Sequence, residues 1–129
     1  MVRPYEARDF DDVKYLNDIS YVSPCTENVL REKLTGKVWV YEDSPLVVGC
    51  VIVAGNLVWS VTVAENWRRK GVATKLLLEA EKHGLPLYLH TEPQSPGNHL
   101  YTKLGYTASK IERDYYGPGQ DAVLMVKRG

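Results

Sequence analysis

Cysteine and histidine are scarce in this sequence, which has two cysteines and three histidines among its 129 residues. Cys25 and Cys50 form no C-x-x-C pair and no Cys/His cluster. His83, His90 and His99 are not at metal-ligand spacing either. The sequence therefore predicts no metal site and two reduced thiols, with Cys50 in a core strand.

An excess of charge of either sign is also lacking, because 16 basic residues balance 16 acidic ones. This balance gives no support to nucleic-acid binding or to attraction to a membrane surface. No N-terminal signal peptide is recognisable, and no apolar run is long enough to span a bilayer. We therefore expect a cytoplasmic protein with no membrane or nucleic-acid partner, and a single domain over residues 1–129.

Two familiar phosphate-binding motifs are absent or misplaced. No G-x-x-x-x-G-K-[ST] occurs, which excludes a P-loop nucleotidase. The letters GPGQDA (117–122) match G-x-G-x-x-A, but they lie between two predicted strands and no helix follows them. A dinucleotide fingerprint opens a helix, so we interpret this stretch as a hairpin turn.

Hydrophobic periodicity predicts the element order β-α-α-β-β-β-α-β-α-β-β, an α/β mixture with helices on the faces of a mixed sheet. Helices are expected after the N-caps Asp9 and Thr26, at Gly71 and at Ser95-Pro96. The predicted strands are 2–6, 37–42, 46–54, 57–64, 85–92, 106–116 and 121–128.

Alternation within 57–64 predicts which side chains share a face of that strand. Ser60 and Thr62 are expected on one face. The other face is expected to carry Leu57, Trp59, Val61 and Val63.

The stretch NWRRKGVATKLL (66–77) places three cations directly before a helix expected to begin at Gly71. A helix start carries a partial positive charge, so cations there are unfavourable unless an anion is bound. First-turn N–H groups have no partner within the helix, and Gly71 lets a ligand approach closely. The pattern predicts an anion site, with a solvated basic loop as the alternative.

Residues 60–82, SVTVAENWRRKGVATKLLLEAEK, resemble the coenzyme A motif of the GNAT N-acetyltransferase superfamily. The core of that motif, [Q/R]-x-x-G-x-[G/A], here reads Arg68 to Ala73. LYTKLGY (100–106) resembles the family element L-Y-x-x-x-G-[FY], and DYYGPGQDAVLM (114–125) is similar to the ends of ribosomal-protein N-acetyltransferase-like members. The resemblance implies the GNAT fold, a mixed, mostly antiparallel sheet flanked by about four helices.

The resemblance also implies how acetyl-CoA would be held. Val61, Thr62 and Val63 match the strand that runs beside the pantetheine arm. The backbone N–H groups that hold the pyrophosphate would come from a loop and helical turn made of Arg68, Arg69, Lys70, Gly71, Val72, Ala73 and Thr74.

Further roles follow from the same resemblance. Tyr101 matches the tyrosine that commonly protonates the leaving thiolate; the alternative is a core aromatic on an amphipathic helix. The family has an asparagine seven residues before this tyrosine, where the chain has Gln94, with Asn98 three before it. Either could contact coenzyme, and Asn98 is our candidate. Tyr115 and Tyr116 precede the last turn, where related enzymes wall the acceptor site.

The general base departs from the family pattern. Aminolysis of a thioester needs a neutral amine, an oxyanion stabiliser, which a backbone N–H near Val63 could supply, and a proton for sulfur. Ribosomal-protein acetyltransferases place a glutamate on the strand after the coenzyme helix. This chain has His90 there, and Glu92 two residues later on the same expected face. Both are candidate bases, and a polar residue at the sheet edge is the alternative for His90.

The sequence therefore predicts transfer of an acetyl group from acetyl-CoA to a primary amine, within a ternary complex and without a covalent intermediate. The acceptor would be a protein or peptide N-terminus or a small-molecule amine. An α-amine, with a reference pKa of about 8 against about 10.4 for a lysine-type amine, costs less to deprotonate. Strand-edge homodimers are compatible with the sequence. A non-catalytic coenzyme A-binding or protein-interaction module with the same fold is the alternative.

Overall fold

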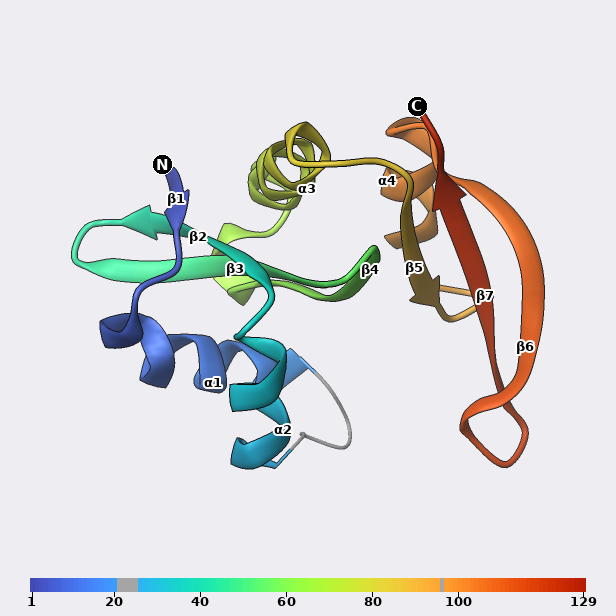
Figure 1. The fold of residues 1–129 in the computed structure, drawn as a ribbon, viewed down its shortest axis with the longest axis horizontal. Coiled ribbons are helices and arrows are strands. Elements are labelled where there is room, and N and C mark those ends of the chain that lie inside the picture. The colour runs from blue at the N-terminus through green and yellow to red at the C-terminus, as the bar shows by residue number, and fades with distance from the viewer. Residues whose placement is uncertain (21–25, 96) are drawn as a thin grey trace.

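One seven-stranded sheet organises the computed structural model, which describes residues 1–20, 26–95 and 97–129 (Figure 1). The strands lie in the order β1-β2-β3-β4-β5-β7-β6, and only the β4–β5 pair is parallel. They are β1 (Val2–Pro4), β2 (Lys37–Asp43), β3 (Leu46–Ala54), β4 (Leu57–Val63), β5 (Leu87–Thr91), β6 (Thr107–Gly117) and β7 (Gln120–Lys127).

Helices cover both faces of the sheet (Figure 1). On one face α1 (Phe10–Ser20) and α2 (Glu27–Lys33) enclose a core cluster with β2 and β3. On the other face α3 (Val72–Lys82) and α4 (Gly97–Lys103) border a second cluster, which draws side chains from β2–β5 and β7. Short 3-10 helices, η1 (Ala7–Asp9) and η2 (Glu65–Trp67), precede α1 and α3.

The predicted element order is confirmed, and the mixed, mostly antiparallel sheet with four α-helices matches the expected fold class. Thr26 caps α2 as predicted, since its hydroxyl accepts a hydrogen bond from the N–H of Val29. Cys50 lies in core strand β3, where burial raises the pKa of its thiol to about 11. Two predictions, those on Cys25 and Pro96, fall outside the described residues.

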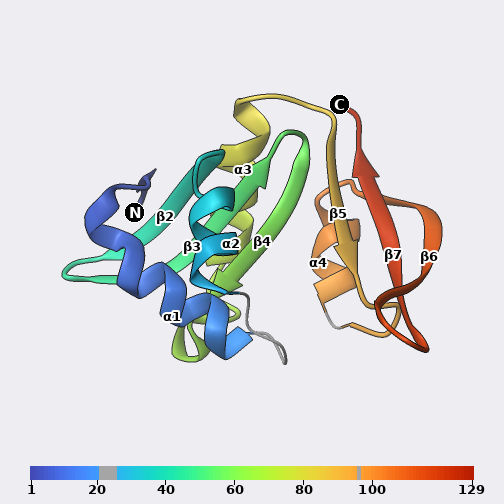
Figure 2. The same ribbon diagram turned by 60° about the horizontal axis from the view of Figure 1, so that its bottom comes forward.

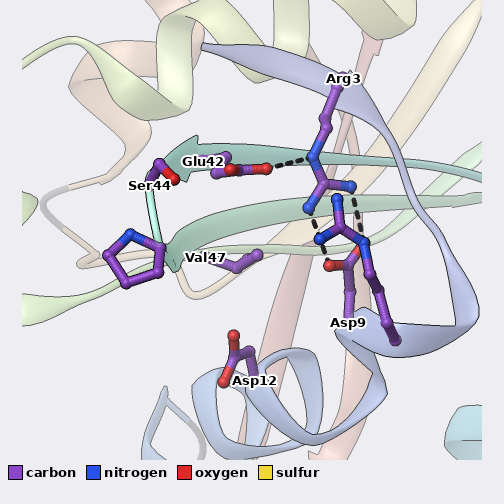
Figure 3. A pocket seen from close by; sticks show the side chains of 8 residues that line it. Arg3, Asp9, Asp12, Glu42, Ser44 and Val47 are labelled. Carbon is purple, nitrogen blue, oxygen red and sulfur yellow. Dashed lines mark hydrogen bonds and ion pairs between the residues drawn. The ribbon is translucent and has the colours of Figure 1, made fainter.

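The sequence predicted that Asp9 caps α1. Asp9 instead closes a capping box at the start of η1. Its carboxylate accepts a hydrogen bond from the N–H of Glu6 and two more from the guanidinium of Arg3, each at 2.8 Å. Arg3 also donates to Glu42 on β2 (Figure 3). Arg3 therefore joins β1, η1 and β2, and it holds the pKa of the Asp9 carboxyl below its usual range.

The predicted facial pattern of β4 holds for Ser60, Thr62, Val61 and Val63 but fails at Trp59, because the strand contains a β-bulge. Val58 lies opposite Val53, whereas Ser60 lies opposite Ile52, so Trp59 is the extra residue. Val61 and Val63 pack toward α3, whereas Trp59 packs against the cluster under α1 and α2. A bulge reverses the alternation of side chains, which periodicity alone cannot reveal.

Ser60 and Thr62 are buried, in a polar network between β4, β3 and α1. The hydroxyl of Ser60 donates to Asn17 Oδ1 at 2.6 Å, and Asn17 Nδ2 donates to the carbonyl of Val13 at 2.9 Å. Thr62 Oγ1 lies 3.3 Å from Cys50 Sγ. The network attaches α1 to β4 on the C-terminal side of the bulge.

The sequence predicts no metal site and no membrane-spanning segment. Among the described residues, no group of three or more His, Cys, Asp or Glu side chains is placed to hold a metal ion. None of the helices in the described ranges is long and apolar enough to cross a membrane.

The Arg3–Asp9 pair makes a testable contribution to stability. Asp9→Asn should lower the free energy of unfolding at neutral pH by about 2 kcal/mol, because a charged hydrogen-bonded pair is lost at a nearly buried site. The folded-state pKa of Asp9 is depressed, so its stabilisation is present above about pH 4 and disappears as the pH falls through the folded-state value. Urea unfolding across this range should show the two proteins converging in acid. Exposed Asp11→Asn is the control and should match the wild type; a pH-independent gap for Asp9→Asn would contradict the assignment.

Candidate functional site

The loop between η2 and α3 has the backbone geometry of an anion site. Arg69 and Gly71 both adopt left-handed conformations, with φ of 64° and 80°. Alternation of left-handed with other conformations turns successive N–H groups into one concavity. No side chain of the described residues caps α3, and no atom lies within 4 Å of a Cβ built on Gly71. The N–H groups that open the helix therefore have no side-chain cap within the described ranges, and the space beside Gly71 is open.

The three cations of this loop are exposed and reinforce the positive end of α3. Arg68 Nε donates to the carbonyl of Val63 at 3.3 Å, which ties the loop to the end of β4. Lys70 Nζ lies 5.6 Å from the centre of the Trp67 ring. Lys75, one turn into the helix, lies at the same distance from the ring of Tyr41. The cations and the helix dipole together favour a polyanion at this end of α3.

Val72, Ala73 and Thr74 form the first turn of α3, but their side chains have different environments. Val72 is buried, and its methyl group would lie only 2.9 Å from a Cβ placed on Gly49, so it anchors the helix to β3. Ala73 and Thr74 are half-buried. The first α-helical hydrogen bond runs from the N–H of Lys75 to the carbonyl of Gly71, at 3.0 Å. The three residues between them therefore contribute the turn whose N–H groups have no helical partner.

Strands β4 and β5 part soon after they meet (Figure 2). Their parallel ladder holds the pairs Leu57–Tyr88 and Val58–Leu89, although β4 continues to Val63 and β5 to Thr91. The bulge at Trp59 begins where this ladder stops. The C-terminal half of β4 is therefore separated from its sheet neighbour on that side.

The backbone of Val61 and Val63 faces this separation. The N–H of Ala64 donates to the carbonyl of Val48 at 2.8 Å, so alternation turns the N–H and C=O groups of Val63 and Val61 away from β3. Thr62 is oriented the other way, with its side chain against Cys50. Of the three residues predicted to line the pantetheine arm, Val61 and Val63 thus present backbone groups to the β5 side.

Two catalytic candidates lie on opposite faces of the sheet beside this separation. Leu89 and Thr91 point toward α3 and α4, since Leu89 belongs to their core cluster and Thr91 bonds to Asn98 of α4. The alternation of β5 therefore turns His90 to the other face. Tyr101, on α4, is half-buried on the α3 side, with its ring 6.3 Å from that of Tyr106.

His90 is held in a cluster that sequence reasoning did not foresee. Its Nε2 lies 3.2 Å from Oε1 of Glu112 on β6, and its ring stacks on Tyr115 at 4.0 Å and an interplanar angle of 17°. The ring of Tyr116 meets that of Tyr115 edge-on, at 5.0 Å. Burial, and secondly the charge of Glu112, raise the pKa of Tyr115. Tyr115 and Tyr116 are 46% and 44% exposed, so these rings are accessible.

Glu92 and Asn98 differ from their expected settings. β5 ends at Thr91, so the alternation that would place Glu92 beside His90 does not extend to it, and Glu92 is exposed. Asn98 Oδ1 accepts from Thr91 Oγ1 at 2.6 Å, while its Nδ2 donates to the carbonyls of Glu92 and Pro93 at 3.0 and 3.1 Å. Through these hydrogen bonds Asn98 connects the end of β5 to the loop that leads into α4.

Comparison with known proteins adds a family and several relatives. Residues 35–108 match the family described as acetyltransferase (GNAT) domain. An N-alpha-acetyltransferase of Sulfurisphaera tokodaii is 37% identical over 82 residues, which is 58% of this chain and 48% of that protein. The chain thus spans about half the length of the curated relatives that it matches most clearly.

Solved structures share the fold at low identity. The ribosomal-protein-S18-alanine N-acetyltransferase from Escherichia coli superposes with a TM-score of 0.85 and 19% identity, covering 99% of this chain and 92% of that one. Arabidopsis thaliana Naa50 in complex with the bisubstrate analogue CoA-Ac-MVNAL superposes with a TM-score of 0.85 and 14% identity. The superposition covers 100% of this chain and 98% of that one. Since the family match extends over more than half of its residues, the chain belongs to the GNAT acetyltransferase family.

Proposed function

We propose that this chain transfers an acetyl group from acetyl-CoA to a primary amine, and that the α-amine of a peptide is its acceptor. The observation that carries the proposal is the parting of β4 from β5, together with the anion loop that follows β4 and with Tyr101 and His90 on opposite faces of the sheet. The names of the relatives and the peptide-containing analogue bound to Naa50 support the same reaction.

Acetyl-CoA fits the donor side by chemistry. The loop from Arg68 to Thr74 offers backbone N–H groups and cations, which suit a pyrophosphate. The backbone edge at Val61 and Val63 can pair with the amide groups of a pantetheine arm. The N–H of Val63 is then our candidate to stabilise the oxyanion that forms on the thioester carbonyl.

The transfer requires an acid and a base at different atoms. The ammonium group first gives up one proton to become a neutral amine, which attacks the thioester carbonyl carbon and forms the C–N bond. The nitrogen loses a second proton as the C–S bond breaks, and the leaving thiolate accepts a proton. Tyr101 is placed on the α3–α4 face to supply the proton to sulfur, and His90 on the opposite face to receive the proton of the amine. An α-amine, with a reference pKa of about 8, costs less to deprotonate than a lysine side chain.

The proposal predicts thiol release from acetyl-CoA with peptides that carry a free α-amine. We expect N-terminally acetylated versions of the same peptides to be inert and the product mass to rise by one acetyl group. A panel of polyamines, aminoglycosides and lysine-containing blocked peptides tests the other amine classes. Binding of coenzyme without thiol release on any amine contradicts the proposal and favours a non-catalytic module.

Gly71→Val should abolish measurable coenzyme binding. The left-handed φ of 80° disfavours any β-branched residue, and the new side chain would occupy the space in front of the N–H groups. Isothermal titration calorimetry with coenzyme A measures the effect. Gly55→Val is the matched control, because Gly55 also has a positive φ, of 64°, and open space, but lies in the β3–β4 turn. Normal coenzyme affinity in Gly71→Val would show that the loop is not part of the coenzyme site. Single alanine variants of Arg68, Arg69 and Lys70 should reduce the affinity less than Gly71→Val does.

Tyr101→Phe should lower kcat by about 10²–10⁴-fold, with coenzyme affinity largely kept, because it removes only the acid that protonates sulfur. Steady-state kinetics beside calorimetry separates the two quantities. Tyr106→Phe serves as a comparison, since that hydroxyl is committed to Glu81, at 3.2 Å, and its loss should change stability rather than turnover. An unchanged kcat in Tyr101→Phe would eliminate it as the acid.

A further inference from the structure

Glu112 reaches His90 across an intervening strand. β7 lies between β5 and β6, and its Leu124 pairs with His90 on one side, while its Ala122 pairs with Glu112 on the other. Alternation places Leu124 and Ala122 on the same face of β7, so His90 and Glu112 share that face as well. The contact between His90 and Glu112 therefore runs diagonally across β7.

Two contacts from one strand fix the orientation of the His90 ring. Glu112 Oε1 lies 3.2 Å from Nε2, and the Tyr115 ring stacks on one face of the imidazole, with the ring centroids 4.0 Å apart. The side chains of His90 and Glu112 are 14% and 31% exposed, so solvent competes only partly with their bond. Both contacts restrain rotation of the imidazole ring. An ion pair at the surface does not require the ring to be held in this way.

The chemistry of this contact selects one tautomer. An ionised carboxylate only accepts hydrogen bonds, so the neutral imidazole carries its proton on Nε2, and the lone pair resides on Nδ1. When Nδ1 takes a proton, the resulting imidazolium lies beside a negative charge. Lys110 Nζ lies 3.8 Å from the same carboxylate oxygen, so a positive charge faces Glu112 as well.

We propose that Glu112 is a positioning residue, which orients His90 with Nδ1 available to accept the proton of the incoming amine. This inference rests on the proposed acetyl transfer. Glu112 would act by orienting His90 and would not contact the substrate. Removing either residue should therefore disrupt the same function.

A double-mutant cycle tests this coupling. Glu112→Ala should reduce kcat by about 10–100-fold, the effect found for residues that orient another functional side chain, with the KM for acetyl-CoA changed less than about twofold. His90→Ala should reduce kcat by at least as much, and adding Glu112→Ala to it should cost nothing further. Glu112→Gln keeps an oxygen that can accept from Nε2 and should recover part of the loss.

Matched controls separate orientation from stability. Glu79 makes a similar bond to His83, at 3.1 Å, on the exposed side of α3, so Glu79→Ala removes a Glu–His pair elsewhere and should leave kcat unchanged. Thermal unfolding of each variant should show less change for Glu112→Ala than would explain its kcat. Multiplicative losses in the double variant, a neutral His90→Ala, or a fall in kcat matched by unfolding would each overturn the inference.

A spectroscopic measurement keeps the inference testable apart from turnover. The stacked Tyr115 ring shifts the His90 ring protons in the NMR spectrum, and these resonances should move in Glu112→Ala but stay in place in Glu79→Ala. If the wild type acetylates no amine, the proposed function fails, while these resonances still report whether Glu112 orients His90. If the wild type turns over and the resonances are unmoved by Glu112→Ala, the positioning role fails alone.

Discussion

The separation of β4 from β5 is the constraint on which the rest of this structure depends. A sheet normally satisfies its backbone groups by continuous pairing, but here the parallel ladder ends after two residue pairs. The backbone edge that remains, at Val61 and Val63, is the part of β4 that can bind an extended ligand. The bulge at Trp59 and the hydrogen bond that Ser60 donates to Asn17 hold that half of β4 on the α1 side, away from β5.

Because two backbone pairs alone cannot hold the sheet together, side chains connect its two parts. The core cluster below α3 includes Val58 from one part and Leu89 from the other. Glu81 of α3 accepts from the hydroxyl of buried Tyr106 and, at 2.7 Å, from Lys127 of β7. Burial, followed by the charge of Glu81, raises the pKa of Tyr106. Helix α3 thus attaches the β5–β7–β6 part with its C-terminal end, and its N-terminal end carries the loop proposed to hold the donor.

The sequence predicted the elements and proposed candidate site residues, but it did not predict which side chains would contact one another, and the reasons are physical. Local patterns sufficed for the strands, for the Thr26 cap and for the basic loop before Gly71, because charge, glycine and periodicity are visible within a few residues. The bulge at Trp59 was missed, since it depends on how β4 aligns with β3. Glu112 was missed for a related reason: its contact with His90 exists only because β7 inserts between two strands that are 22 residues apart at the contact.

The two-faced arrangement of Tyr101 and His90 has a consequence for how the site can diversify. Residues that would meet the donor belong to β4, the loop before α3 and α4, whereas those beside His90 belong to the β6–β7 hairpin. The ring of His90 is contacted by Glu112 and Tyr115, with Lys110 and Tyr116 next to them, and all four of these residues lie on β6. Under the proposed function, substitutions in the hairpin would alter which amine is accepted and leave binding of the donor unchanged. Acceptor choice and donor choice would then be separate variables, each carried by its own stretch of chain.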